Sequence, residues 1–176
     1  MQGTVLVAYA SKYGATRDIA EAIGRTLREA GLTVDLRECR DVKSLDGYVA
    51  VVLGSAVYVG RWRREAADLL RNGEAQLAKL PVWLFSSGPT GDGDAEELLH
   101  GWHFPAALEP IAERIEPRDI VVFSGALDAS ALRGFDAFLA RSVKAPVGDY
   151  RDLYAVSDWA RGIAQALGAE RATVPA

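Results

Sequence analysis

The chain opens with a short apolar run, a turn and an amphipathic segment, and this order constrains the fold more than any other feature. Residues 4–10 form a continuous apolar run of strand length, as expected of a strand that is covered on both faces. Ile19, Ile23 and Leu27 then recur every four residues, which predicts a helix that stops near Gly31. A strand followed directly by a helix is the building unit of a parallel α/β sheet.

The same alternation continues along the chain. Further strands are predicted at residues 33–38, 48–54, 82–85 and 120–123, and further helices at residues 63–78, 106–115 and 159–167, the last entered from Ser157 as its N-cap. Right-handed crossovers between these elements predict an α/β three-layer sandwich around a five-stranded parallel sheet in the order 2-1-3-4-5. In this order the chain reverses direction between strands one and three, so we expect a ligand over the carboxyl ends of strands one, three and four.

One domain accounts for most of the chain. At 176 residues and 49% hydrophobic composition, the chain is long enough for one well-buried domain and too short for two. We expect this domain to span residues 1–168, with an insertion at residues 128–152. Residues 169–176 lack periodic apolar side chains and are expected to form an irregular tail.

Charge and cysteine content exclude several classes of function. The net charge of −4, with basic residues scattered among acidic ones, gives no general attraction to nucleic acid, so we expect no nucleic-acid partner. A single cysteine, Cys39, excludes an internal disulfide and is expected to fill apolar space at a strand end. The chain enters its first strand without a cationic leader, and no apolar run approaches the span of a bilayer. We therefore expect a cytoplasmic protein with peripheral membrane contact at most.

Three loops are predicted at the carboxyl edge of the sheet, and all are rich in residues that approach a phosphate or a flat ring closely. The expected cofactor-binding residues are Ser11, Lys12, Tyr13, Gly14, Ala15 and Thr16 in the first loop, Ser55, Ala56, Val57, Tyr58, Val59, Gly60 and Trp62 in the second, and Ser86, Ser87, Gly88, Pro89, Thr90, Gly91 and Asp92 in the third. Because three loops converge, a shared binding site is a stronger prediction than any one loop supports.

The first loop is typical of an anion site. Its hydroxyls and free amides lie at a helix N-terminus, where unpaired N–H groups and the helix dipole favour a phosphate. Lys12 and Arg17 either add positive charge to the site or lie at solvated surface positions. The chain contains neither a nucleotide-binding P-loop motif nor a dinucleotide fingerprint after the first strand. The ends of strands one and three lack the acidic residues of response-regulator receivers.

The other two loops offer partners for a planar ring. Tyr58 or Trp62 is expected to stack on the ring, although either side chain would equally well cover the top of the core. Gly60 permits a peptide orientation that presents a carbonyl to a ligand. The third loop, with three hydroxyls, two glycines and a proline, provides backbone donors for a polar ring edge or forms an ordinary turn.

Four segments give the sequence a resemblance to a known family. They are Tyr9-Ala10-Ser11-Lys12-Tyr13-Gly14-Ala15-Thr16, Gly54-Ser55-Ala56-Val57-Tyr58-Val59-Gly60, Gly125-Ala126-Leu127 and Ser157-Asp158-Trp159. With them the chain resembles flavodoxin-like FMN-binding domains, and specifically the branch of menaquinone-dependent protoporphyrinogen IX dehydrogenases, the flavodoxin-type protoporphyrinogen oxidases. The resemblance implies a non-covalent FMN whose phosphate is held by the first loop and whose ring is held by the other two.

The resemblance implies a flavoprotein of electron transfer, in which the cofactor carries the electrons and no side chain acts as a nucleophile. We expect an FMN-dependent oxidoreductase or carrier whose partner is a redox protein, a quinone or a porphyrinogen. A third hypothesis is a cofactor-free interaction module with the same fold. Apolar and neutral groups around the flavin in an acidic protein would disfavour its anionic reduced form and lower the potential of the second electron.

Two segments are less decisive. Leu132, Phe135, Phe138, Leu139 and Val143 fall on one face of a possible helix in the insertion. This stripe either packs on the domain or docks a quinone, a membrane or a partner; its mixed charges differ from the strongly basic insertion of membrane-associated family members. His100 and His103 lie near acidic residues at loose spacing, so we expect no metal. His103 or Trp102 would instead border the substrate edge of the flavin.

Overall fold

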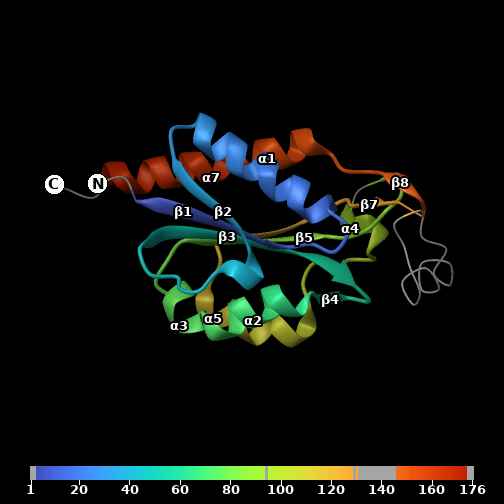
Figure 1. The fold of residues 1–176 in the computed structure, drawn as a ribbon, viewed down its shortest axis with the longest axis horizontal. Coiled ribbons are helices and arrows are strands. Elements are labelled where there is room, and N and C mark those ends of the chain that lie inside the picture. Colours follow the sequence, from blue (N-terminus) through green and yellow to red (C-terminus); the bar gives the residue numbers. More distant parts are fainter. Residues whose placement is uncertain (1–2, 94, 129, 131–145, 174–176) are drawn as a thin grey trace.

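A parallel sheet forms the centre of the molecule (Figure 1). The computed structural model describes residues 3–93, 95–128, 130 and 146–173. The parallel strands are β1 (Thr4–Ala10), β2 (Thr33–Glu38), β3 (Tyr48–Tyr58), β5 (Val82–Ser87) and β6 (Asp119–Phe123). They lie in the order β2-β1-β3-β5-β6. Numbered along the chain, this is the order 2-1-3-4-5, so the predicted fold class is confirmed.

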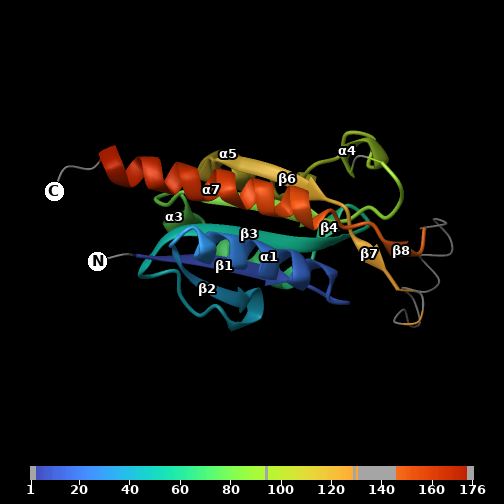
Figure 2. The same cartoon turned by 90° about the horizontal axis from the view of Figure 1, so that it is seen from above.

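Helices cover both faces of this sheet. On one face lie α1 (Ala15–Glu29) and α7 (Leu153–Thr173), and on the other lie α2 (Arg64–Asn72), α3 (Glu74–Leu77) and α5 (Glu109–Ile115) (Figures 1 and 2). The connections include the short helix α4 (Ala95–Leu98) and the 3-10 turns η1 (Cys39–Asp41) and η2 (Ala106–Leu108). The result is a three-layer sandwich with the sheet in the middle.

Each face of the sheet has its own apolar core. Val5 and Val7 of β1 are buried against the layer of α1 and α7, whereas Leu6 is buried against the layer of α2 and α5. Ile19 and Ile23, two of the side chains whose spacing predicts α1, are fully buried against the sheet. Burial of one such aliphatic side chain stabilises the fold by roughly 1.5–3 kcal/mol. These cores explain why the strand-and-helix pattern of the sequence determines the architecture.

The third strand is longer than predicted, because four residues assigned to a loop continue it. β3 extends to Tyr58, and β4 (Arg61–Trp62) pairs antiparallel with its end. Val59 and Gly60 form the two-residue turn with φ values of 51° and 68°, the left-handed pair that matches the twist of a hairpin. Ser86 and Ser87, also predicted as loop, likewise belong to strand β5.

The helices differ from the prediction at their ends. The single helix predicted for residues 63–78 is divided at Gly73 into α2 and α3. Helix α7 begins six residues earlier than predicted, so Ser157 lies inside it. The Asp152 carboxylate caps it instead, accepting hydrogen bonds from the Tyr154 and Ala155 amides at 3.0 and 2.9 Å. Helix α7 also continues to Thr173, into the segment predicted to be an irregular tail.

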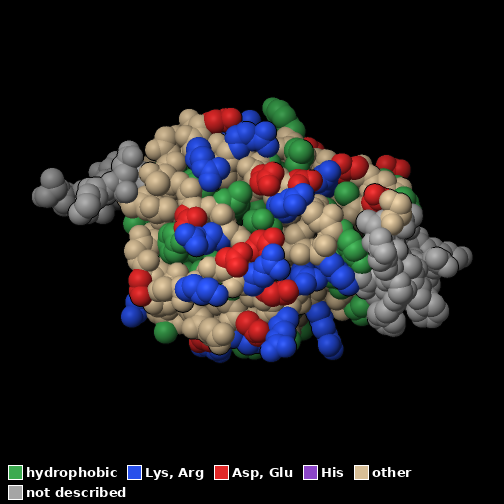
Figure 3. Space-filling view, in the orientation of Figure 1, with side chains coloured by type: hydrophobic (Ala, Val, Ile, Leu, Met, Phe, Trp, Pro, Cys, Tyr) green, Lys and Arg blue, Asp and Glu red, His purple; other side chains and the backbone are tan. Residues whose placement is uncertain are grey.

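A small antiparallel sheet has one strand just before the predicted insertion and the other within it. β7 (Ala126–Leu127) pairs with β8 (Gly148–Asp149) beyond the carboxyl edge of the main sheet (Figure 2). The apolar stripe predicted within the insertion lies outside the described residues. Among the described residues, no helix combines the length and the apolar character needed to cross a bilayer. On the face shown in Figure 3, basic and acidic side chains are interspersed.

Candidate functional site

A cavity of about 100 Å³ lies at the carboxyl ends of β1, β3, β5 and β6. Segments that are far apart in the sequence contribute its walls. The lining residues are Ser11, Lys12, Tyr13, Ala15 and Thr16, then Ala56, Val57 and Tyr58, then Ser87, Gly88 and Thr90, and finally Gly125, Ala126 and Leu127. The structure therefore brings residues of all three predicted loops together, at the edge where a ligand was expected.

The first loop turns directly into helix α1. Gly14 occupies the N-cap position with φ of 97°, and its amide donates a hydrogen bond to Ser11 Oγ at 3.0 Å. The bond closes the loop, and the first amides of α1 remain without intrahelical partners, as at any helix N-terminus. Thr16, in the first turn of α1, is buried and lines the cavity. Hydroxyls, amides and the positive end of the helix dipole thus converge at one end of the cavity.

Lys12 and two tyrosines form the wall between the first and second loops. The Lys12 ammonium lies 5.5 Å from the centre of the Tyr13 ring and 5.7 Å from that of Tyr58. Cation–π contacts at exposed sites are worth roughly 0.5–1 kcal/mol each. Lys12 is the one charged side chain among the lining residues. Arg17, the other basic candidate, instead pairs with Asp18 and Glu21 at 3.6 and 3.8 Å.

The second loop divides into residues that line the cavity and residues that support it. Trp62 is buried in the core, where its N–H donates to Ser86 Oγ at 2.9 Å and its ring meets Phe104 edge-on at 5.1 Å. Ser55 is fully buried, donating to the Ala56 carbonyl and accepting from the Arg63 amide. Trp62 therefore covers the core, and Tyr58 is the aromatic side chain of this loop that faces the cavity.

The remaining predicted residues lie around the cavity without lining it. Val59 and Gly60 form the turn of the β3–β4 hairpin, and the Trp102 indole nitrogen lies beside Gly60. In the third loop, the Ser86 hydroxyl is engaged by Trp62, and the Pro89 carbonyl accepts a hydrogen bond from the Gly125 amide at 2.8 Å. Gly91 is buried and Asp92 is exposed, both outside the cavity lining.

A fourth segment, Gly125 with strand β7, completes the cavity and was absent from the predicted site. It lies against the third loop, and a Cβ added at Gly125 would fall 2.9 Å from the Gly88 carbonyl oxygen. Its position after β6 was the signal that could have revealed it, because the carboxyl ends of neighbouring parallel strands share one edge. The sequence prediction considered only strands one, three and four.

A second hollow of about 440 Å³ adjoins the cavity and shares Tyr13, Ala15, Ala126 and Leu127 with it. Arg151 crosses this hollow, with ion pairs of 2.5 Å to both Asp18 of α1 and Asp149 of β8. Hydrogen bonds from Arg151 lower the pKa of the Asp149 carboxyl below its usual value. The guanidinium thereby connects strand β8 to the first turn of α1.

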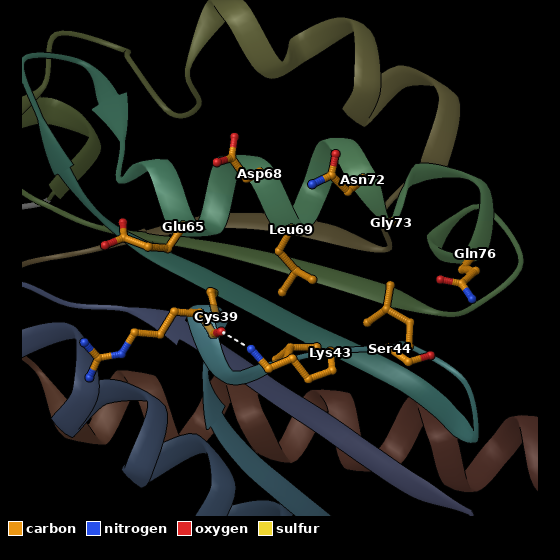
Figure 4. A pocket seen from close by; sticks show the side chains of 12 residues that line it. Cys39, Lys43, Ser44, Glu65, Asp68, Leu69, Asn72, Gly73 and Gln76 are labelled. Carbon is orange, nitrogen blue, oxygen red and sulfur yellow. Dashed lines mark hydrogen bonds between the residues drawn. The ribbon is translucent and has the colours of Figure 1, made fainter.

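A third hollow, of about 380 Å³, lies between α2 and the segment after β2 (Figure 4). Its charged lining residues carry both signs, and one of them, Lys43, donates to the Arg40 carbonyl at 3.4 Å. Burial raises the pKa of the Cys39 thiol, which keeps it protonated and unreactive. Cys39 is the buried filler that the sequence predicted, and this hollow includes none of the expected cofactor-binding residues.

Residues 6–153 match the family model of the flavodoxin domain. The chain belongs to the flavodoxin family. Flavodoxins bind FMN and transfer electrons. No curated protein sequence matches the chain.

Solved structures share the flavodoxin fold with this chain. The flavodoxin of Streptococcus pneumoniae TIGR4 is 17% identical, with a TM-score of 0.59 over 93% of this chain and 99% of its own. A cysteine-to-serine mutant of the flavodoxin from Pseudomonas aeruginosa is 19% identical, with a TM-score of 0.54 over 94% and 99%. The rubredoxin oxygen:oxidoreductase of Desulfovibrio gigas is 17% identical, with a TM-score of 0.64 over 97% of this chain. This chain spans 37% of that longer protein.

The residues of the flavodoxin cavity fit FMN chemically. The first loop offers Ser11, Thr16 and free amides to a phosphate, and the second loop offers the aromatic ring of Tyr58 beside Ala56 and Val57 to a planar ring. At Gly125, the absence of a Cβ lets the segment after β6 approach the Gly88 backbone. Hydrogen-bond donors suit the phosphate of FMN, and an aromatic side chain suits its ring.

Proposed function

We propose that this flavodoxin binds FMN non-covalently in the four-loop cavity and passes electrons to a redox partner. The main support for this proposal is that four segments far apart in the sequence lie together beside the N-terminus of α1, at the switch point of the sheet. Open α/β sheets bind ligands at this place because the loops diverge there and leave a crevice.

Each wall of the cavity has a distinct task in this proposal. Ser11, Thr16 and the first amides of α1 hold the phosphate, and Tyr58 packs against the ring. Ser87, Gly88 and Thr90 offer hydroxyl and backbone groups to the polar edge of the ring. FMN supplies the electron-transfer chemistry, so the protein contributes binding, orientation and control of the potential. No nucleophilic or acid–base side chain is required.

A second candidate is an oxidoreductase of the protoporphyrinogen oxidase branch, which acts directly on a quinone or a porphyrinogen. The hollow of about 440 Å³ beside the cavity favours it, because an organic substrate there would lie next to the ring. Among the described residues, Asp18, Asp128 and Asp149 line this hollow together with one cation, Arg151. A neutral quinone is compatible with this excess of carboxylates, whereas they would repel the carboxylates of a porphyrinogen.

The first experiment is the absorbance spectrum of the purified protein and the mass of the ligand released on denaturation. A flavin spectrum and the mass of FMN are expected. A colourless protein that gains no flavin from added FMN would instead support a cofactor-free interaction module.

The second experiment separates a carrier from an enzyme. Photoreduced protein is mixed with a quinone, a porphyrinogen or a one-electron acceptor protein under anaerobic conditions, and reoxidation is followed by absorbance. Repeated turnover with a quinone alone would favour the oxidoreductase. Rapid reoxidation by the acceptor protein alone would favour the carrier.

A further inference from the structure

Two buried serines lie side by side at the carboxyl ends of β3 and β5. Ser55 and Ser86 are register partners in the parallel sheet, and both residues are fully buried. Buried hydroxyls need hydrogen-bond partners, because an unsatisfied one costs free energy. Both serines find partners in strand β4 and the residue that follows it. Ser86 Oγ accepts from the Trp62 indole N–H at 2.9 Å, and Ser55 Oγ accepts from the Arg63 amide at 2.9 Å.

These two hydrogen bonds fasten the β3–β4 hairpin to the central sheet. Within the hairpin, Trp62 pairs with Val57, and Arg61 pairs with Tyr58. Val57 and Tyr58 line the cavity of the candidate site, whereas Trp62 belongs to the core. The hairpin therefore has one strand in the wall of the cavity, and its other strand is bound to buried hydroxyls of the sheet.

The position of the hairpin is thus set by packing inside the fold, before any ligand arrives. Trp62 is only 6% exposed, and its ring meets the Phe104 ring edge-on with the ring centres 5.1 Å apart. A side chain that is held by both packing and a hydrogen bond loses little further freedom when a ligand binds. Preorganisation of this kind increases affinity, because the ordering of the wall does not oppose binding.

We infer that Ser55, Ser86 and Trp62 are positioning residues that hold the β3–β4 hairpin ready for the flavin ring. This inference rests on the proposed FMN binding. It concerns the ring alone, because the hairpin includes Tyr58, whereas the phosphate is assigned to the first loop and the N-terminus of α1. A loosened hairpin therefore weakens the binding of FMN and of riboflavin, which lacks the phosphate, by the same factor.

The test titrates FMN and riboflavin into variants of the three residues, well below their melting temperatures. Trp62→Phe keeps a ring without the indole donor, Ser86→Ala removes its acceptor, and Ser55→Ala removes the acceptor for the other hydrogen bond. We expect each variant to raise both dissociation constants about fivefold, as for a hairpin that is in position about a fifth of the time. The double variant of Trp62 and Ser86 should match the single ones, because either substitution already removes the same hydrogen bond.

Trp159→Phe is the matched control for a merely structural role. The Trp159 indole also donates one hydrogen bond, to the Asp119 carboxylate at 2.8 Å, and Asp119 begins β6 at the amino edge of the sheet. This variant should lower the free energy of unfolding and leave both dissociation constants unchanged. Ser11→Ala gives the opposite comparison, since it should weaken the binding of FMN more than that of riboflavin.

Several results would overturn the inference while leaving the proposed function intact. One is an unchanged pair of dissociation constants in Ser86→Ala, which loses a single oxygen atom and provides the test even where Trp62→Phe does not fold. Another is a double variant whose dissociation constants rise by the product of the two single factors, since Trp62 and Ser86 would then act separately. A loss confined to FMN would assign the effect to the phosphate. Failure of the wild-type protein to bind FMN would overturn the proposed function as well.

Discussion

At the scale of single residues, Val59 carries backbone strain at the rim of the cavity. A β-branched residue at φ of 51° is a true outlier, and such strain costs on the order of 1–3 kcal/mol. Val59→Asn should therefore raise the free energy of unfolding by about 1 kcal/mol, because Asn-Gly is the preferred pair in this turn. Urea denaturation measures the change. Val147→Asn is the control, because Val147 is another exposed valine, and it should change the free energy of unfolding by less than about 0.5 kcal/mol. If Val59→Asn lowers the free energy of unfolding, Val59 does not carry backbone strain.

Ser11 joins the structure of the first loop to its proposed role in binding. Ser11→Ala removes both the acceptor for the Gly14 amide and a donor to the phosphate. Hydrogen bonds to charged groups contribute about 1.5–3 kcal/mol, so the FMN dissociation constant should rise roughly 10- to 100-fold. Flavin fluorescence titration provides the measurement. Ser44→Ala is the control, because Ser44 lies far along the chain in an exposed turn, and it should leave the FMN dissociation constant unchanged. If Ser11→Ala also leaves the dissociation constant unchanged, Ser11 does not bind the phosphate.

At the scale of elements, we expect the substitution of glycine by alanine to have opposite effects on stability at two positions. Gly125→Ala places a Cβ 2.9 Å from the Gly88 carbonyl oxygen, which forces the third and fourth loops apart and should destabilise the protein by about 1–3 kcal/mol. Gly162 lies in α7 with no atom near its added Cβ, so Gly162→Ala should stabilise the protein by about 0.5–1 kcal/mol. Thermal unfolding of both variants tests the loop contact, and equal effects would contradict it.

From the ion pairs of Arg151 we predict how the stability of the protein depends on pH. Arg151→Gln should lower stability at pH 7 by about 1–2 kcal/mol, toward the low end because the carboxylates are partly exposed. The pKa of Asp149 is lowered in the folded state. Its contribution is therefore complete above the unfolded pKa of about 4 and is lost as the pH falls through the folded value.

The loss caused by Arg151→Gln should accordingly be largest at pH 7 and shrink as the pH falls below the unfolded pKa of about 4 and through the lower folded value. Urea denaturation at both pH values gives the comparison. Arg161→Gln is the matched control, since Arg161 forms a single exposed ion pair with Asp158 and should cost less than about 0.5 kcal/mol. A loss from Arg151→Gln that does not depend on pH would assign Arg151 a packing role only.

Sequence periodicity could predict the strands and their order, because residues such as Val5 and Ile19 reveal burial through the pattern of their neighbours. It could not determine that Trp62 belongs to the core, since this depends on contacts with Ser86 and Phe104 made across the fold. The ends of β3 and α7 were also missed, because a hairpin pair and the Asp152 cap override local preference. Composition alone does not reveal which loop residues face a cavity.

At the scale of the whole molecule, ligand binding and folding stability are linked. The segments that follow β1, β3, β5 and β6 line the cavity. A ligand that fills the cavity therefore contacts the segments after four of the five parallel strands at once. Such a ligand binds the folded chain and leaves the unfolded chain without a comparable site. Its binding energy therefore adds to the stability of the entire domain.

Added FMN should consequently raise the melting temperature of the flavin-free protein. At a concentration about 100-fold above the dissociation constant, the expected stabilisation is about 2.7 kcal/mol. For a domain of this size that corresponds to roughly 5–10 °C. Riboflavin lacks the phosphate that the first loop is proposed to hold, so at the same concentration its shift should be clearly smaller. Differential scanning calorimetry measures both, with inorganic phosphate as the control for a general salt effect. Equal shifts with FMN and riboflavin would mean that the N-terminus of α1 does not bind the phosphate.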